Sequence, residues 1–310
     1  MKMNSAKKEN RFSPVLKAIV RKVLPPGIYS TLWWAKNDAG EWWRAVNDGD
    51  EWRTALQLVR LRRRMYLMPP GSNETEGLFN YTVHINNGRI FYVLYKDIFI
   101  KRVYHFEAQR PDPLILDLGS HIGLAILYFK HLYPQARIIG FEPDPATFPY
   151  LKDNVSQNGL TGVQLVQAAL AGQEGVLTFY SDGKLGSSLA EYLPEGIPPG
   201  WAKYEVPCVR LRDYLIEPVD FLKMNIEGAE WEVIADSEDR LHYVREMVVE
   251  YHHLPGLPRT LHKILDILHR HDFEYVVSDF GLDTYGRARP PVCLQPKTRY
   301  YRQIYARRAG

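Results

Sequence analysis

From about residue 112 onward, short apolar stretches alternate with stretches of helical length, and this alternation constrains the fold more than any other feature. The pattern predicts helices at 122–133, 145–158, 228–238 and 259–271, and strands at 114–118, 136–142, 163–169, 175–180, 219–225, 244–250, 273–278 and 299–306. Apolar strands separated by helices of this length form a mostly parallel sheet covered on both faces. We therefore expect a doubly wound α/β fold over residues 112–310, with its ligand at the carboxyl ends of the strands.

The first part of the chain, residues 1–76, is interpreted as a basic helical extension rich in tryptophan. Residues 1–68 have a net charge of +8 and contain five of the seven tryptophans, the tail 297–310 has +5, and the body between them sums to −10. Residues 12–24 form a basic amphipathic pattern, and a second helix is expected from about Asp50 to Met65. The amphipathic helix fits either a membrane surface or a docking face on the chain's own α/β domain or on a second subunit of a homodimer.

The composition excludes or disfavours several classes of protein. No apolar run reaches about 18 residues and the N-terminus lacks a signal peptide's apolar core, so we expect a cytoplasmic protein, peripheral to the inner face of the membrane only if residues 12–24 bind lipid. Cys208 and Cys293 lack partners at metal-ligand spacing, so we expect buried thiols and no metal site. Basic charge confined to the termini argues against nucleic acid as a partner.

Residues 77–111 are predicted to hold a β-hairpin and the lead-in to the α/β domain. The stretches 78–85 and 89–95 are rich in β-branched and aromatic residues and flank Asn86-Asn87-Gly88. Because Asn-Gly is the strongest short hairpin signal, we place the turn there.

The turn after the first predicted strand carries Asp117, Gly119 and Gly123, in the pattern D-x-G-x-x-x-G. Glycine allows a sharp turn and close approach of a ligand. A dinucleotide site requires G-x-G-x-x-G, whereas Ser120 and His121 stand between these glycines. The spacing therefore favours a cofactor that presents no phosphate to the loop.

Further polar residues stand where other strands end. Glu142 ends the second strand, where a carboxylate accepts hydrogen bonds from a ribose diol. At the end of strand 219–225, polar residues alternate with apolar ones, at Lys223, Asn225 and Glu227. Buried polar groups need partners, so these residues indicate a ligand cleft. The alternative is a Lys223–Glu227 ion pair that only stabilises the turn. The next strand ends with a further carboxylate and candidate general-base imidazoles, Glu250, His252 and His253.

Taken in order over residues 92–280, these pieces resemble the FkbM family of S-adenosylmethionine-dependent methyltransferases. The resemblance runs through the stretches "ILDLGSHIGLAILYF", "IIGFEPDPATFPYLKDNVSQNGL", "FLKMNIEGAEWEVI" and "VVEYHH". It implies a seven-stranded Rossmann-like sheet and O-methylation of a small-molecule or glycan hydroxyl. It also implies a cofactor site made of Asp117, Gly119, Ser120, His121, Gly123, Glu142, Ala168 and Ala169, with Ala168 and Ala169 beside the adenine.

The family signature K-x-D-x-E-G-A-E maps onto Lys223, Asn225, Glu227, Gly228 and Glu230. We assign Lys223 and Glu250 to substrate binding and Glu227, His252 and Asn225 to catalysis, with His121 a third candidate base. The chain departs from the family where Asn225 replaces aspartate, and where Ser120-His121 replaces Ala-Asn. An amide cannot act as a base, nor bind a divalent cation tightly, so Asn225 disfavours a metal-dependent mechanism.

Two other functions compete with this interpretation. A short-chain dehydrogenase would need a helical Tyr-x-x-x-Lys, and Tyr180 and Lys184 have that spacing on a stretch that reads as a loop. A non-catalytic or degenerate scaffold of the same fold is favoured by Asn225 and by the long Trp-rich extension.

Overall fold

The computed structural model describes residues 52–68, 74–183, 187–189, 193, 196–254, 256–279 and 300–309. The predicted helix 12–24, with its membrane or docking contact, and Cys293 lie outside these residues. The chain divides into two compact units, Met1–Leu67 and Met68–Gly310, and each is described by itself. In the first unit the structure describes α3 (Trp52–Leu67), the helix expected from about Asp50. Within the described ranges, no helix has the length and apolar character needed to cross a bilayer.

The second unit is built around a seven-stranded sheet in the order β12-β13-β11-β10-β3-β4-β5. Six strands are parallel, and β13 runs antiparallel between β11 and β12. The bounds are β3 (Leu114–Leu118), β4 (Arg137–Phe141), β5 (Val163–Val166), β10 (Val219–Met224), β11 (Val244–His253), β12 (Phe273–Asp279) and β13 (Tyr300–Arg308). This confirms the predicted mostly parallel, Rossmann-like α/β fold.

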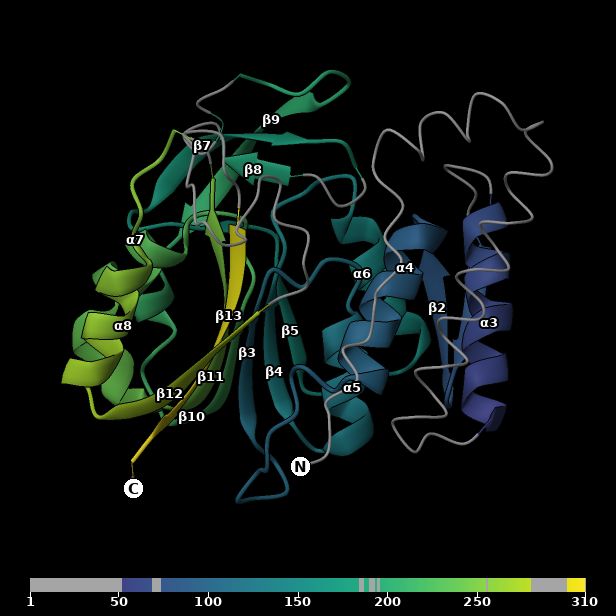
Figure 1. The fold of residues 1–310 in the computed structure, drawn as a ribbon, viewed down its shortest axis with the longest axis horizontal. Coiled ribbons are helices and arrows are strands. Elements are labelled where there is room, and N and C mark those ends of the chain that lie inside the picture. Colours follow the sequence, from purple (N-terminus) through teal and green to yellow (C-terminus); the bar gives the residue numbers. More distant parts are fainter. Residues whose placement is uncertain are drawn as a thin grey trace, which may run out of the picture. The chain divides into compact units, whose positions relative to one another are not determined.

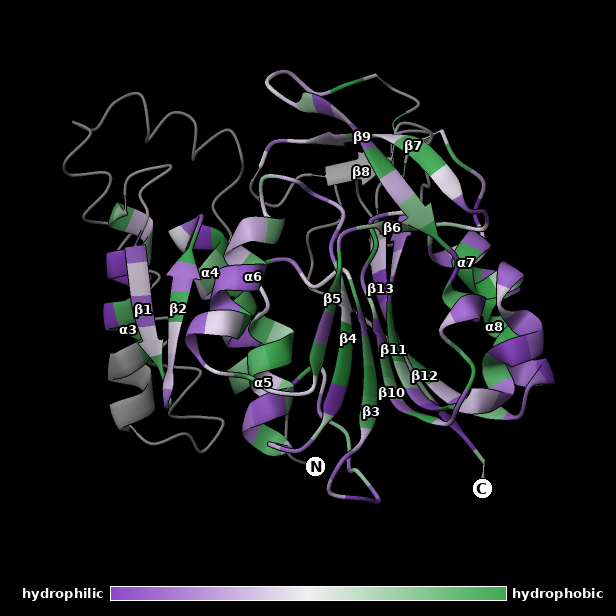
Figure 2. Ribbon diagram, turned by 180° about the vertical axis from the view of Figure 1, so that it is seen from behind, coloured by the Kyte–Doolittle hydropathy of each residue, from purple (hydrophilic) through white to green (hydrophobic). Residues whose placement is uncertain are grey.

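Helices cover both faces of this sheet (Figure 1). On one side lie α5 (Leu124–Leu132) and α6 (Phe148–Gln157), and on the other lie α7 (Glu230–Asp236) and α8 (Leu261–Arg270). All five residues of β3 are buried, as a strand covered on both faces requires. Figure 2 shows the matching pattern of hydropathy, with an apolar β3 and a hydrophilic outer surface on α8.

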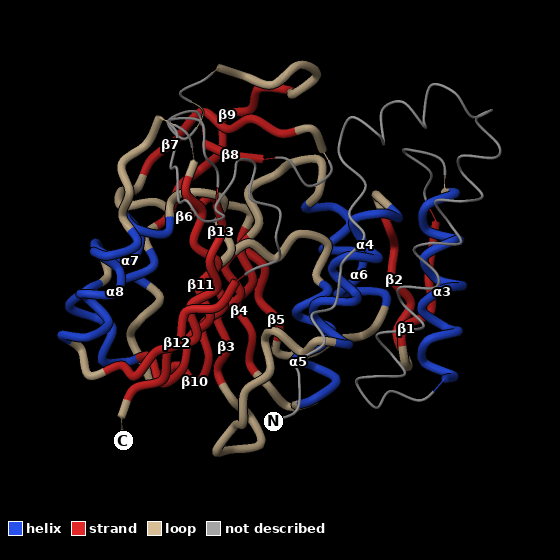
Figure 3. The backbone as a smooth tube through the Cα atoms, viewed as in Figure 1, coloured by secondary structure: helices blue, strands red, loops and turns tan. Residues whose placement is uncertain are grey.

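A second, four-stranded sheet has the order β6-β9-β7-β8. It lies beyond the carboxyl ends of the parallel strands (Figure 3) and consists of β6 (Ala169–Leu170), β7 (Gly175–Ser181), β8 (Ser187–Leu189) and β9 (Ala202–Val209). The strand predicted at 163–169 is therefore wrong in its extent, because the chain leaves the main sheet after Val166. β9 escaped prediction because only Val206 and Cys208 are buried in it and Pro207 interrupts the strand pattern.

The predicted hairpin exists, but its turn and its second strand were wrong. β1 (Glu74–Leu78) and β2 (Tyr81–Ile85) pair around Phe79 and Asn80. Residues 89–95 instead belong to α4 (Gly88–Tyr95), which continues as a π-helix over Lys96–Ile100. The reason is that Asn87 caps this helix, since its Oδ1 accepts hydrogen bonds from the backbone N–H groups of Arg89 and Ile90, at 3.1 and 3.2 Å. The Asn-Gly pair thus starts a helix here.

Side-chain amides from α6 and from Asn158, the residue that caps its C-terminus, form hydrogen bonds with the outer edge of β2. Asn154 Oδ1 accepts the His84 N–H at 2.6 Å, and its Nδ2 donates to the His84 carbonyl at 3.1 Å and to that of Ile122 at 2.8 Å. Asn158 pairs with both backbone groups of Thr82 in the same way, at 2.8 Å each. These amides occupy the place of a further strand, so the hairpin is joined to the catalytic fold by hydrogen bonds.

Candidate active site

The predicted cofactor loop, between β3 and α5, requires glycine at both positions that the sequence singled out. Gly119 has φ +84°, and a Cβ there would lie 1.9 Å from the Asn225 carbonyl oxygen. Gly123 has φ +91°, and a Cβ there would lie 2.8 Å from Leu151 Cδ1. The loop therefore packs directly on the chain that leaves β10, which brings two separate motifs together.

The backbone amides of this loop are already engaged. The N–H groups of Gly119 and Ser120 both donate to the Phe141 carbonyl, at 3.0 and 2.8 Å, and the Gly123 N–H donates to the Ser120 carbonyl at 2.8 Å. His121, with φ +50°, donates its N–H to Glu142 Oε2 at 2.8 Å. A pyrophosphate needs such amides free, so this geometry agrees with the prediction of a phosphate-free ligand.

Glu142 stands at the tip of β4, as predicted, and is 6% exposed. Its two oxygens accept the N–H groups of His121 and Asp144, at 2.8 and 2.9 Å. Burial raises the pKa of this carboxyl to about 7, although both of these hydrogen bonds act to lower it. A carboxylate has about four acceptor sites, so Glu142 retains capacity for a diol.

Lys223 and Asp117 form a buried ion pair behind the loop. They are register partners on adjacent strands, and Lys223 Nζ lies 3.1 Å from Asp117 Oδ1. The same ammonium donates to the Leu118 carbonyl at 3.3 Å and to the Gly119 carbonyl. Lys223, predicted to bind substrate and only 3% exposed, is thus placed where it braces the cofactor loop.

Two buried acceptors beside the loop have no hydrogen-bond donor among the described residues. They are Asp117 Oδ2 and Asn225 Oδ1. An unsatisfied buried oxygen is costly, and two of them next to a glycine cradle suit a ligand that brings N–H groups or positive charge. The carboxylate of Asp117 disfavours an anionic group at this particular place.

Glu250 lies on β11 and is buried, at 4% exposure. It accepts a hydrogen bond from the hydroxyl of Tyr104, a residue of the lead-in that the sequence did not single out. Burial, followed by the charge of Glu250, raises the pKa of Tyr104, so its hydroxyl keeps its proton and acts as donor. Glu250 was predicted to bind substrate, and its observed partner is part of the protein. No local pattern marks Tyr104, because the two residues are 146 positions apart.

His252 lies between two carboxylates of the loop and helix that follow β10. Its Nδ1 is 2.8 Å from Glu230 Oε1, and its Nε2 is 3.7 Å from Glu227 Oε1. Burial alone would lower the pKa of His252, but the charges of Glu227, Glu230 and Glu250 outweigh it and raise the pKa to about 10. The ring is therefore an imidazolium at neutral pH, whereas a general base must be unprotonated.

Glu227 is the most accessible acid of this group. Its side chain is 36% exposed, compared with 1% for Glu230. Its backbone has φ +56°, a conformation that is rare outside glycine and that concentrates at functional sites. Gly228, with φ +123°, follows and completes the turn into α7.

Ala168 and Ala169, predicted to flank the adenine, are buried and follow the end of β5 at Val166. The Glu142 N–H donates to the Val166 carbonyl at 3.1 Å, which brings the ends of β4 and β5 together. His253 is buried as well, and burial, with the charge of Arg259, lowers its pKa. Cys208 is buried, as expected.

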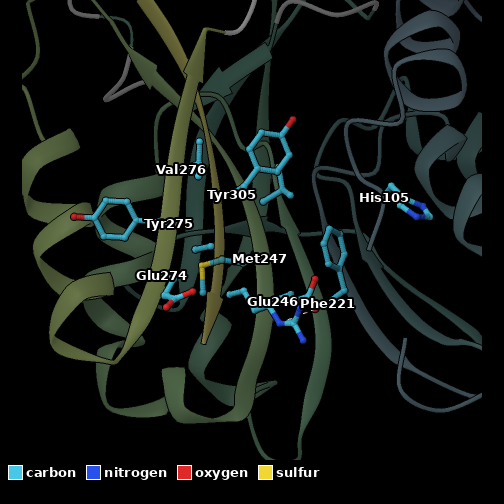
Figure 4. Close-up of a pocket in the computed structure, with 11 residues that line it drawn as sticks. His105, Phe221, Glu246, Met247, Glu274, Tyr275, Val276 and Tyr305 are labelled. Atoms are coloured by element: carbon cyan, nitrogen blue, oxygen red, sulfur yellow. Dashed lines mark ion pairs between the residues drawn. The ribbon is translucent and has the colours of Figure 1, made fainter. Parts of the chain in front are cut away.

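A hollow of about 470 Å³ lies elsewhere on the sheet, nearer the amino ends of the strands (Figure 4). Phe221 of β10, Glu246 of β11 and Glu274 of β12 line it, together with His105 and Tyr305. No predicted site residue lines this hollow. The acids, glycines and His252 meet instead at the carboxyl edge of β3, β4, β10 and β11.

The dehydrogenase alternative loses its remaining support. Tyr180 lies in β7, so it is not on a helix, and Lys184 lies outside the described residues. In a strand, residues four apart do not stack on one helical face as that motif requires.

Comparison with known proteins agrees with the geometry. The methyltransferase FkbM domain model matches residues 117–275. Methyltransferase sdnD of Sordaria araneosa is 31% identical over 56% of this chain and 79% of that protein. The 31-O-demethyl-FK506 methyltransferase FkbM of Streptomyces tacrolimicus is 28% identical, over 62% and 85%. The 2-O-methyltransferase NoeI of Sinorhizobium fredii is 29% identical, over 46% and 65%. With a family model that matches half of its length and relatives of this similarity, the chain belongs to the FkbM family of S-adenosylmethionine-dependent methyltransferases.

Proposed function

We propose that this protein transfers the methyl group of S-adenosylmethionine to a hydroxyl group of a sugar, in a glycan, a glycolipid or a glycosylated metabolite. The observation that carries the proposal is the accessible carboxylate of Glu227. This residue follows β10 closely, and the Asn225 carbonyl between them packs on Gly119. A hydroxyl acceptor must lose a proton during transfer, and a carboxylate placed there can receive it. The names of two relatives, a 31-O- and a 2-O-methyltransferase, agree with oxygen as the acceptor atom.

The residues of the loop suit this cofactor, which brings a sulfonium, an ammonium and a ribose diol and no phosphate. Asp117 Oδ2 and Asn225 Oδ1 are the unsatisfied acceptors for its positive end, and Gly119 leaves the space. Glu142 would accept the ribose hydroxyls, while Ala168 and Ala169 would border the adenine. Ser120, His121 and Gly123 hold the loop in shape through their backbone bonds.

When bound, S-adenosylmethionine supplies a methyl group that its sulfonium charge makes electrophilic. The protein's part is to hold the acceptor oxygen in line with that methyl at about 3 Å, since such positioning supplies much of the rate. Glu227 takes the proton of the hydroxyl. The protonated state of His252 supports Glu227 rather than His252 as the base. His252 then serves as the cation beside the Glu227 carboxylate.

The test uses the purified full chain, S-adenosylmethionine labelled on its methyl carbon, and glycan and glycolipid extracts from cells that lack the gene. We expect label in a product heavier by one methylene, and a methyl ether by NMR. Glu227→Gln should bind cofactor with unchanged affinity and lose about 100-fold or more in kcat. Label on nitrogen or carbon, or a Glu227→Gln variant with full activity, would contradict the proposal.

A degenerate scaffold remains the second candidate, because Asn225 stands where relatives of the family have aspartate. Asn225→Asp separates the two. A large gain of turnover in this variant would identify the natural site as impaired. Unchanged or reduced turnover, together with measurable activity of the natural chain, would show that the amide is sufficient.

A further inference from the structure

Glu230 is a buried acid behind the proposed base, and its place in the family signature does not by itself reveal what it does. It is the first residue of α7 and is 0% exposed. Its Oε1 accepts the Gly228 N–H at 3.1 Å and the Nδ1–H of His252 at 2.8 Å. Glu230 thus ties the turn that carries Glu227 to strand β11.

The described groups around His252 favour its charged form or fix its ring. Glu230 faces Nδ1, Glu227 faces Nε2, and Glu250 stands two residues earlier on the same strand. From β13, the ring of Tyr301 packs edge-on at 4.9 Å between centroids. Three acids therefore surround one imidazole, and with Glu230 bound to one nitrogen the ring can orient only its other nitrogen toward Glu227.

We infer that Glu230 is a positioning residue: by anchoring His252 as an imidazolium, it keeps the Glu227 carboxylate ionised and aimed at the acceptor hydroxyl. This inference rests on the proposed function, in which Glu227 is the base. Without the cation, the carboxylates of Glu227, Glu230 and Glu250 would repel one another, and like charges in a shared site make one of them take up a proton. A protonated Glu227 could not accept the hydroxyl proton.

The first experiment titrates the histidines of the free full chain by NMR, with ¹³C-labelled imidazoles and with His252→Asn to assign the signal. We expect His252 to stay protonated through neutral pH. In Glu230→Gln, where the amide keeps the shape and loses the charge, its pKa should fall by about one unit or more. A wild-type His252 that titrates near its ordinary value overturns the inference, and this readout holds even if the variant does not fold.

The second experiment separates positioning from simple structural support. Glu230→Gln should lower kcat, by up to about 100-fold, while the KM and the dissociation constant for S-adenosylmethionine stay unchanged, because Glu230 touches neither ligand. The matched control is Glu238→Gln, which alters a partly exposed carboxylate–imidazole pair with His271, at 3.3 Å. The control should change neither kcat nor the titration of His252.

The two proposals fail in different ways. The titration needs neither cofactor nor acceptor, so its result does not depend on which atom is methylated. If His252 behaves as expected and no hydroxyl is methylated, O-methylation is wrong and the anchoring of His252 stands. If hydroxyl methylation is found and Glu230→Gln leaves both kcat and the titration unchanged, the inference about Glu230 is wrong.

Discussion

Glu142 links cofactor binding to pH, and Glu142→Gln measures that link. In the free protein this carboxyl is buried with a pKa of about 7, so it is largely protonated below pH 7. Its folded pKa lies above the unfolded value of 4.5, so its contribution to stability is present below about pH 4.5 and is lost as pH rises through 7. A ribose diol donates to the ionised form and therefore offsets the cost of burying that charge.

The size of the effect follows from the hydrogen bonds. Hydrogen bonds to a charged group contribute about 1.5–3 kcal/mol each, and an unsatisfied buried donor costs about 1–3 kcal/mol. Glutamine loses the charge, and its NH₂ faces one of the two backbone N–H groups that now donate to Glu142 at 2.8 and 2.9 Å. That mismatch is present with and without ligand, so the change in binding comes from the ribose hydrogen bonds to the lost charge. We expect a loss of about 3 kcal/mol in binding, which corresponds to roughly a 100-fold rise in Kd.

Calorimetry with S-adenosylhomocysteine checks this prediction. Ionisation of the ligand itself affects its binding to the wild type and to the variant equally, so a difference between their pH profiles reports on Glu142. Wild-type affinity should fall by up to about tenfold per pH unit below pH 7, and binding at pH 7 should release protons. The variant should lose this pH dependence. Glu217→Gln is the control, since that exposed carboxylate pairs with Arg137 at the opposite end of β4, at 2.7 Å. Affinities within threefold of each other, or identical pH profiles, would refute the role of Glu142.

Three further substitutions test the framework of the site. Gly119→Ala should abolish cofactor binding in calorimetry, because its Cβ would lie 1.9 Å from a carbonyl oxygen, whereas Gly77→Ala, with nothing within 4 Å, should bind normally. Lys223→Met leaves the buried Asp117 carboxylate without its cation and should lower the free energy of unfolding by about 3–5 kcal/mol in urea titrations. A loss below about 1 kcal/mol would contradict a stabilising role for the ion pair. Asn154→Leu removes three hydrogen bonds to the backbone and should speed amide hydrogen exchange in β2. Unchanged exchange would show that these bonds do not stabilise the hairpin.

Much of the fold was predictable because burial imposes a period on the sequence. Strand β3 and its neighbours β4 and β10 consist mostly of apolar residues, and each is followed by a glycine or a polar residue. Asp117, Glu142 and Glu227 could be placed at one edge of the sheet because parallel strands share the direction of their carboxyl ends. The resemblance to the family signature then led to the prediction of the cofactor loop.

The failed predictions involve signals that are ambiguous over a few residues. Asn86-Asn87-Gly88 fits a hairpin turn and also fits a helix cap, and only the hydrogen bonds of Asn87 to the start of α4 distinguish them. The true hairpin turn contains Phe79 at φ +53°, which no propensity favours.

The sequence by itself determined the parallel sheet, the glycine loop and the edge at which the acids gather, because each depends on local periodicity and on strand direction. Only the tertiary structure decided the partner of each charge. Lys223 pairs with Asp117 across the sheet, Glu250 accepts from Tyr104, and His252 is held between Glu227 and Glu230. Protonation states follow from these contacts, since burial and neighbouring charges shift a pKa and neither can be read from spacing along the chain.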